Sequence, residues 1–149
     1  MREDLHLYNK KLLSLFRQKY GRGAQSDKTI RAMGKKYIGP SFKGVYPWDL
    51  MPNLPNNSYA VINTDDHTKG GVHWVGIYSN NNNYYVFDSF GRKPSSILHP
   101  FVEKQQGLGK NIININKTVD QANKQQDCGL RTIAMFVIAK KYGIDSVFD

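Results

Sequence analysis

Apolar side chains recur with helical spacing close to the start of the chain. The apolar positions are Leu5, Tyr8, Leu12, Leu15 and Phe16. Spacings of three and four residues place side chains on one face of a helix, so the pattern predicts an amphipathic helix over about residues 4–20. Gly21 comes directly after this run and is a suitable C-cap.

Residues 21–58 contain four proline pairs, namely Gly-Pro, Tyr-Pro, Met-Pro and Leu-Pro. Because proline interrupts regular structure, we expect this segment to be irregular. A long irregular segment is unusual inside a compact domain, and such segments often carry function.

Short apolar runs with the length and composition of strands follow this segment. They cover residues 59–63, 72–78, 84–87 and 112–115. The four asparagines at 80–83 predict a hairpin loop between the second and third runs, because Asn tolerates left-handed turn conformations.

From Leu130 the chain is apolar on nearly all sides for ten residues, which predicts a helix buried in the core and ending at Gly143. No repeat or linker divides the chain, so residues 1–149 are expected to form one domain. Together the elements predict an α+β fold: a small, mainly antiparallel sheet packed on a central helix, with the N-terminal helix against it.

Charge is concentrated at the N-terminal end of the chain. Residues 1–44 hold eleven Lys and Arg but three acidic residues, so +8 of the net charge of +9 lies there. Such a basic segment attracts polyanions, nucleic acid above all, but a solvated and solubilising surface explains it equally well. No apolar run is long enough for a membrane span, and the first residues lack a signal-peptide core, so neither a membrane nor a secreted location is expected.

The chain contains a single cysteine, Cys128, which excludes an intramolecular disulfide and a Cys-rich metal site. A lone Cys is commonly a small buried hydrophobe, and the alternative is a nucleophile. Cys128 stands where the central helical pattern begins, and a helix N-terminus favours the thiolate and offers free N–H groups. The Cys128 N–H is then a candidate oxyanion donor, and Gly129 allows a substrate backbone to approach closely.

His73 and Asp88 are candidates for the base and for the acid that orients it. Strand alternation puts His73, Val75 and Ile77 on one face, with Trp74 on the other. Asp88 ends the next apolar run, and adjacent antiparallel strands can bring the two side chains together. The structural alternatives are a satisfied strand histidine and a turn aspartate.

Gln121 lies seven residues before Cys128 in a polar, loop-like segment. A loop of this length can fold back and direct a side-chain amide at the thiol, which would give a second oxyanion donor. Gln125 and Gln126 are nearer in sequence, so composition alone does not choose among the three.

In these stretches the chain resembles the adenovirus maturation proteases and the wider clan that includes the SUMO-specific proteases. The stretches are Ala60–Thr64, Gly70–Trp74, Tyr85–Gly91, Gln121 and Asp127–Leu130. The resemblance covers roughly residues 36–142. It implies a papain-like core in permuted His-Asp-Cys order, with His73 as base, Asp88 as orienting acid, Cys128 as nucleophile and Gln121 as oxyanion donor.

The resemblance also favours Gln121 over its two neighbours, because the seven-residue offset matches the family pattern. It implies that Trp74 helps to wall a narrow substrate cleft that admits Gly near the scissile bond. Small size and an Asn- and Lys-rich composition look closest to proteases of virophages, giant viruses and related large DNA transposons.

The expected function is therefore a cysteine endopeptidase that cleaves viral capsid or core precursors during virion maturation, in the virion and the infected cell. No metal or other cofactor is expected to be required. Stimulation by DNA or a viral peptide is what the resemblance implies, although a second Cys for attaching a peptide by a disulfide is absent from this sequence. The alternatives are a SUMO- or ubiquitin-type isopeptidase and a nucleic-acid-binding module with an inactive protease fold.

Overall fold

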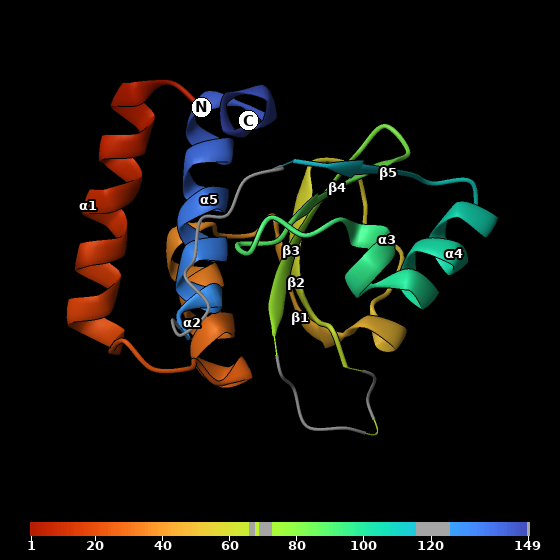
Figure 1. Ribbon diagram of the computed structural model, residues 1–149, viewed down its shortest axis with the longest axis horizontal. Helices are drawn as coiled ribbons and strands as arrows, with labels where there is room; N and C mark the ends of the chain where they lie inside the picture. The colour runs from red at the N-terminus through yellow and green to blue at the C-terminus, as the bar shows by residue number, and fades with distance from the viewer. Residues whose placement is uncertain (66–67, 69–72, 116–125, 149) are drawn as a thin grey trace.

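Helices lie on both sides of one five-stranded sheet in the computed structural model, which describes residues 1–65, 68, 73–115 and 126–148 (Figure 1). The helices are α1 (Glu3–Tyr20), α2 (Asp27–Tyr37), α3 (Pro94–Ile97), α4 (His99–Gly107) and α5 (Cys128–Tyr142), with short 3-10 turns at Trp48–Leu50 and Ile144–Val147. The strands are β1 (Phe42–Pro47), β2 (Ser58–Asn63), β3 (Trp74–Asn80), β4 (Asn83–Phe87) and β5 (Asn111–Asn114). The predicted α+β class is confirmed.

The sheet has the order β1-β2-β3-β4-β5. Its centre is antiparallel, because β3 pairs with both β2 and β4 in that sense, as predicted. Its two edges are parallel, with β1 beside β2 and β5 beside β4. Parallel neighbours need a crossover connection, and the segment between β4 and β5 supplies one through α3 and α4. The sheet is thus mixed, with the antiparallel meander at its centre.

The two faces of β3 bury different clusters. Val75 and Ile77 belong to the cluster under α3 and α4, whereas Trp74 and Tyr78 pack with the cluster around α5. This alternation is the predicted one. Gly76 lies on the α5 side, where a Cβ atom would come within 2.7 Å of the Phe136 and Thr132 side chains, so a glycine lets the central helix lie directly on the sheet.

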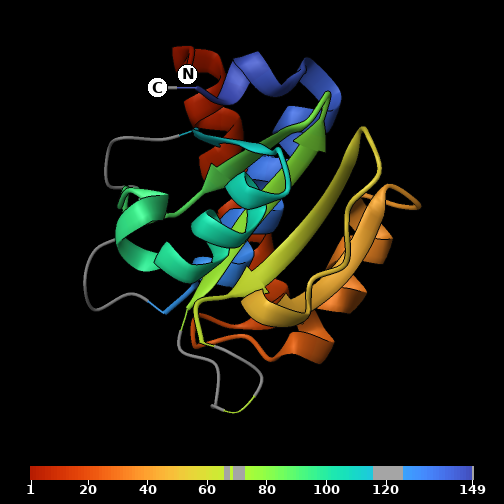
Figure 2. The same ribbon diagram turned by 90° about the vertical axis from the view of Figure 1, so that its right-hand side faces the viewer.

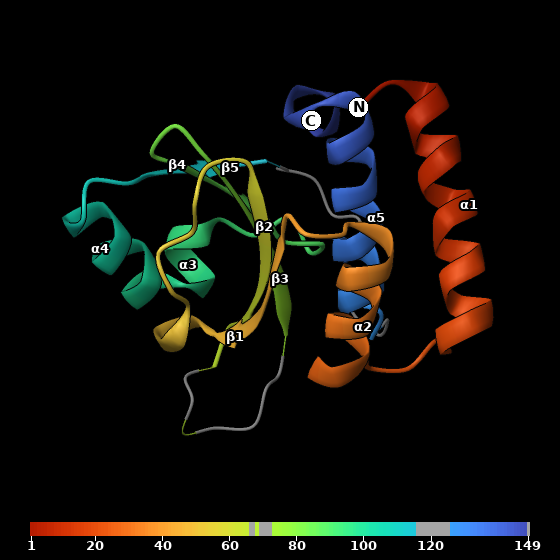
Figure 3. The ribbon, with the colours of Figure 1, turned by 180° about the vertical axis from the view of Figure 1, so that it is seen from behind.

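Helix α5 is buried on nearly every side because the sheet covers one face and α1 covers the opposite one, as the view from behind shows (Figure 3). It begins at Cys128, the residue expected at its N-terminus, and ends as predicted at Gly143, where φ is 91° and the N–H donates to the Ala139 carbonyl. Although α5 is largely apolar, neither it nor any other helix in the described ranges is long and apolar enough to span a bilayer.

The prediction that residues 21–58 are irregular is wrong for α2 and β1. Ser26 caps α2, because its hydroxyl accepts the Thr29 N–H at 3.1 Å, and Ile30 and Met33 bury the inner face of that helix. The proline pairs lie outside α2 and, apart from Pro47, outside the strands, so they separate elements and do not prevent them.

Helices α3 and α4 cover the face of the sheet opposite α5 and were not predicted (Figure 2). Prolines at the first positions of both helices are compatible with helix starts, since the N–H groups there lack intrahelical partners. Phe101 anchors α4, with 1% of its surface exposed. The two short helices therefore pack on one face of the sheet and α5 packs on the other.

Candidate active site

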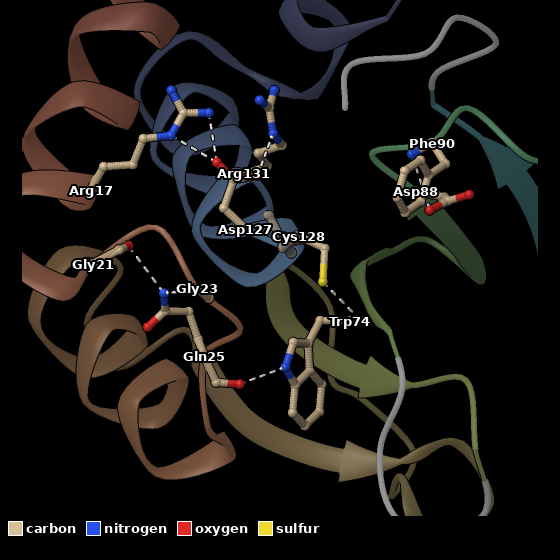
Figure 4. A network of polar contacts seen from close by, with 11 residues as sticks. Arg17, Gly21, Gly23, Gln25, Trp74, Asp88, Phe90, Asp127, Cys128 and Arg131 are labelled. Atoms are coloured by element: carbon tan, nitrogen blue, oxygen red, sulfur yellow. Dashed lines mark hydrogen bonds and ion pairs between the residues drawn. The ribbon is translucent and has the colours of Figure 1, made fainter. Parts of the chain in front are cut away.

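Cys128 is the first residue of α5, and 7% of its surface is exposed. The first turn of a helix presents backbone N–H groups without intrahelical partners and the positive end of the helix dipole. The Trp74 N–H donates to the Cys128 sulfur at 3.4 Å, which joins the start of β3 to the start of α5 (Figure 4). The thiol therefore lies where the sequence predicted it, at a helix N-terminus beside the strand that follows His73.

His73 lies between Asp88 and Cys128, one residue before β3 and not inside the strand as predicted. Its Nε2 is 2.5 Å from Oδ1 of Asp88, and both side chains are buried. The Cys128 side chain also interacts with the His73 ring and contributes to raising the His73 pKa. Because Nε2 faces the carboxylate, Nδ1 is the ring nitrogen left for the thiol. The structure thus brings His73, Asp88 and Cys128 together in one line of contacts.

Electrostatic interactions among these residues lower the pKa of Asp88 and raise the pKa of His73. Burial alone would lower the pKa of His73, but hydrogen bonds to Asp88 and Cys128 outweigh it, and the His73 pKa lies above its ordinary value. Burial would raise the pKa of Asp88, but hydrogen bonds from His73 and Arg92 lower it to about 2. Asp88 is therefore a carboxylate at neutral pH that stabilises a proton on His73.

Phe90 and Arg92 complete the surroundings of the carboxylate and were not singled out from the sequence. Oδ1 of Asp88 also accepts the Phe90 N–H at 3.3 Å, while Oδ2 accepts the Arg92 N–H at 3.0 Å and its Nε at 2.9 Å. The Phe90 ring lies 5.1 Å from the His73 ring, and the Arg92 guanidinium lies 5.0 Å over the Phe90 ring. An aspartate at a turn with an arginine four residues later was the available signal.

Trp74 and Gly129 flank the thiol and make contacts within the protein that were not predicted. The indole N–H of Trp74 donates to the Gln25 carbonyl at 3.0 Å. A Cβ atom on Gly129 would come within 2.8 Å of Cδ1 of Ile30 and 3.4 Å of the Trp74 ring, and Gly129 is buried. Close packing of α5 on α2 therefore requires a residue without a side chain at this position. Substrate contact by either residue stays a prediction.

Asp127, the residue before the thiol, is held by two arginines that sequence reasoning did not identify. Oδ2 accepts Nε of Arg17 at 2.8 Å and lies 2.6 Å from its second nitrogen, while Oδ1 accepts Nε of Arg131 at 2.9 Å. Burial raises the pKa of Asp127, and the hydrogen bonds from Arg131 and Arg17 reverse this, so the pKa lies below its ordinary value. Arg131, at four residues' distance on α5, was detectable in the sequence, whereas Arg17 on α1 was not.

Gln121, the predicted oxyanion donor, and Gln125 lie outside the described residues, so the choice of donor stays a prediction. Within the described ranges, no group of three or more His, Cys, Asp or Glu side chains is arranged to hold a metal ion. The expectation that no metal or other cofactor is required likewise stays a prediction.

Most of the chain is similar in sequence to known proteins. The profile of the adenovirus endoprotease family matches residues 42–146, a range that contains His73, Asp88, Gln121 and Cys128. The chain is 35% identical over 77 residues to the "Protease" of Bovine adenovirus C serotype 10, covering 48% of this chain and 38% of that protein. It is 27% identical over 114 residues to the "Protease" of Bovine adenovirus 2, covering 68% of this chain and 54% of that protein.

A third similarity is to the leptin receptor of Rattus norvegicus, 36% identical over 103 residues, which covers 64% of this chain and 8% of that receptor. This match involves a small part of the receptor. The chain spans less than two thirds of the length of each of these three proteins. None of the comparisons tests the predicted virophage, giant-virus or transposon origin.

Proposed function

Because this chain belongs to the adenovirus endoprotease family, we propose that it is a cysteine endopeptidase whose nucleophile is Cys128. The observation that carries the proposal is the contact of the buried His73 ring with the Asp88 carboxylate at 2.5 Å on one side and with the Cys128 thiol on the other. A thiol at a helix start, a base in contact with it and an acid that orients the base are the parts of a thiol hydrolase.

The reaction follows from these contacts. His73 takes the proton of Cys128, and the thiolate attacks the scissile carbonyl carbon to give a tetrahedral oxyanion. The Cys128 N–H and, by family resemblance, the Gln121 amide hold that oxyanion. Its collapse breaks the C–N bond, His73 gives the proton to the leaving amine, and a thioester remains. A water molecule, deprotonated by His73, then hydrolyses the thioester and regenerates the thiol.

Asp88 supports this cycle without moving a proton itself. Its carboxylate keeps Nε2 of His73 in the N–H form, so Nδ1 stays available to the thiol. As the imidazolium forms, the neighbouring negative charge stabilises it, in line with the raised pKa of His73. Phe90 and Arg92 keep the carboxylate and the ring in place.

The proposed substrates are capsid or core precursor proteins of a DNA virus, cut at Gly-containing sites during virion maturation. Support comes from family membership and from the name of the matching bovine adenovirus proteins. The Trp74 side chain is proposed to narrow the substrate cleft. Trp74 follows His73 in the chain, and its main-chain N–H donates to the Cys128 sulfur. The virion and the infected cell are the proposed sites of action.

DNA is proposed as a stimulating partner of the peptidase, on the ground that +8 of the net charge lies in residues 1–44. The basic side chains in this range belong mainly to α1 and α2, and most of them are exposed. Neutralised phosphates release counterions, so any stimulation should weaken steeply as salt rises.

A panel of Gly-containing peptides read by mass spectrometry tests the proposed function. Wild-type protein and Cys128→Ala would be compared, with and without duplex DNA. Cleavage by the wild-type protein alone supports the peptidase and gives the cleavage site. Equal cleavage by Cys128→Ala would refute the nucleophile, and selective hydrolysis of SUMO or ubiquitin conjugates would favour the isopeptidase instead.

A further inference from the structure

Helix α1 reaches the candidate active site although it lies outside the range that the family profile matches. That match begins at residue 42, whereas α1 covers Glu3–Tyr20. Figure 1 shows α1 lying along α5 on the side away from the sheet. The close-up shows Arg17 reaching from α1 to the carboxylate of Asp127, beside the thiol (Figure 4).

The geometry at Asp127 leaves its carboxylate little freedom. Two nitrogens of Arg17, at 2.8 and 2.6 Å, hold Oδ2, and Nε of Arg131, at 2.9 Å, holds Oδ1. The Asp127 side chain is 3% exposed, and its main-chain carbonyl accepts the Arg131 N–H at 3.0 Å in the first turn of α5. Both ends of Asp127 are thus fixed, and the next residue along the chain is Cys128.

The loop after α1 makes a second, independent contact with the site. The Gln25 side-chain amide donates to the Gly21 and Gly23 carbonyls, at 3.3 and 2.8 Å, and so holds the loop in a closed shape. In that shape the Gln25 carbonyl accepts the Trp74 indole N–H at 3.0 Å. The N-terminal segment therefore contacts the neighbour of the proposed nucleophile and the neighbour of the proposed base.

We propose that Arg17 is a positioning residue of the peptidase, which fixes Asp127 between α1 and α5 and thereby sets the place of Cys128 relative to His73. On this proposal α1 is part of the active site. The inference rests on the proposed function. A buried carboxylate left without Arg17 would rearrange, because an unpaired buried charge is costly, and the start of α5 would move with it.

The test compares the wild-type protein with Arg17→Met, Arg17→Lys and Lys10→Met. Lys10 is exposed on the same helix, so Lys10→Met removes the same charge without touching Asp127 and controls for effects on DNA or overall charge. The readouts are kcat and KM on a cleaved peptide, the rate of alkylation of the single thiol by iodoacetamide, and thermal unfolding. All rates are measured at a temperature at which every variant is folded.

We expect Arg17→Met to lower kcat by about 10- to 100-fold, with little change in KM, because a small misplacement of a reacting group costs rate and not ground-state binding. Alkylation of Cys128 should slow in parallel. Arg17→Lys keeps the charge but not the two-nitrogen contact, so it should recover part of kcat. When the rates are measured without DNA, Lys10→Met should behave like the wild-type protein.

Wild-type kcat and alkylation in Arg17→Met would overturn the proposal and leave α1 a purely structural helix. A rise in KM with unchanged kcat and alkylation would overturn it as well. If Arg17→Met does not fold, the comparison of Arg17→Lys with the wild-type protein decides. If the wild-type protein cleaves no peptide, the proposed function fails, and the alkylation rates still show whether Arg17 sets the state of the thiol.

Discussion

The proposed base and the proposed nucleophile are positioned in different ways. His73 and Asp88 are brought together by the antiparallel pair β3 and β4, and the carboxylate is held by the residues that follow it, Phe90 and Arg92. Cys128 is positioned by α5, whose start is held from α1 through Arg17, 110 residues away in sequence. One half is thus built locally, whereas the other depends on the docking of distant helices.

This difference predicts that the two halves of the site respond differently to substitutions. A local hairpin keeps its geometry when distant packing loosens, since its contacts are few residues apart in sequence. The start of α5 has no side-chain cap of its own, because the Asp127 side chain is occupied by the two arginines. We therefore expect changes on α1 and α2 to act on the thiol first and on the His73–Asp88 pair last.

The largest loss of activity is expected from a substitution in the local half, at Asp88. Asp88→Asn removes the charge that stabilises protonated His73 and can present an N–H to the ring, so kcat should fall by about 10³- to 10⁴-fold. The His73 pKa should fall as well, visible in the ring proton shifts measured by NMR as pH is varied. Asp145→Asn, an exposed acid near the other end of α5, is the matched control. Retained activity in Asp88→Asn would show that the acid has no part in the reaction.

The distant half can be disturbed at Gly129 without changing any charge. Gly129→Ala places a Cβ atom 2.8 Å from Cδ1 of Ile30, which is fully buried, so the free energy of unfolding should drop by about 1–3 kcal/mol. Ile30→Val in the same chain should recover part of the loss by making room. Gly107→Ala, where no atom lies within 4 Å of the added Cβ, is the control. Unchanged denaturant midpoints in Gly129→Ala would contradict the packing argument.

The dependence of stability on acid pH tests the local half through Asp88. The Asp88 pKa is about 2 in the folded protein, against an ordinary value of 3.8. A lowered acid pKa gives stability that is fully present above about pH 4 and is lost as pH falls toward 2, here about 2 kcal/mol. Unfolding free energies measured from pH 6 to pH 2 should therefore decline less in Asp88→Asn than in the wild-type protein. Parallel curves would contradict the assigned shift.

His73 contributes with the opposite sign, because its pKa is raised. That stability is fully present below the ordinary pKa of about 6.5 and is lost as pH rises through the folded-state value. The hydrogen-bonded pair should thus stabilise the fold most between about pH 4 and pH 6.5. The same measurements of unfolding free energy, extended to pH 9, test the predicted loss of stability at higher pH.

The smallest effect on kcat is expected at Arg92, which contacts only Oδ2 of Asp88. Arg92→Gln should lower kcat by about tenfold, since the Arg92 main-chain N–H still binds Oδ2 at 3.0 Å. Arg92→Lys should recover less than half of that loss, because an ammonium lacks the planar guanidinium that lies over Phe90. Lys93→Gln removes a neighbouring charge and is the control. A loss as large as that of Asp88→Asn would mean that Arg92 itself acts on the substrate.

Sequence patterns predicted the local half better than the distant half, for a physical reason. Patterns that span a few residues were enough to predict the β3–β4 hairpin, α1, α5 and the end of α5 at Gly143. Helix α2 and strand β1 were missed because the proline pairs led to the expectation that the whole range 21–58 is irregular. Helices α3 and α4 were missed because they are short, with four and nine residues. Nothing in the spacing of residues links Arg17 to Asp127, so the contact that ties α1 to the thiol needed the structure.

Intact-mass spectrometry of an acid-quenched reaction tests the central claim most directly. The wild-type protein and Cys128→Ala would each be mixed with the same cleaved Gly-containing peptide and stopped within the first turnover. The account predicts a wild-type species heavier by the acyl part of the peptide, mapped to Cys128 and released by hydroxylamine as expected for a thioester, and none in Cys128→Ala. Peptide cleavage without any adduct, or with an adduct on another residue, would contradict a Cys128 nucleophile.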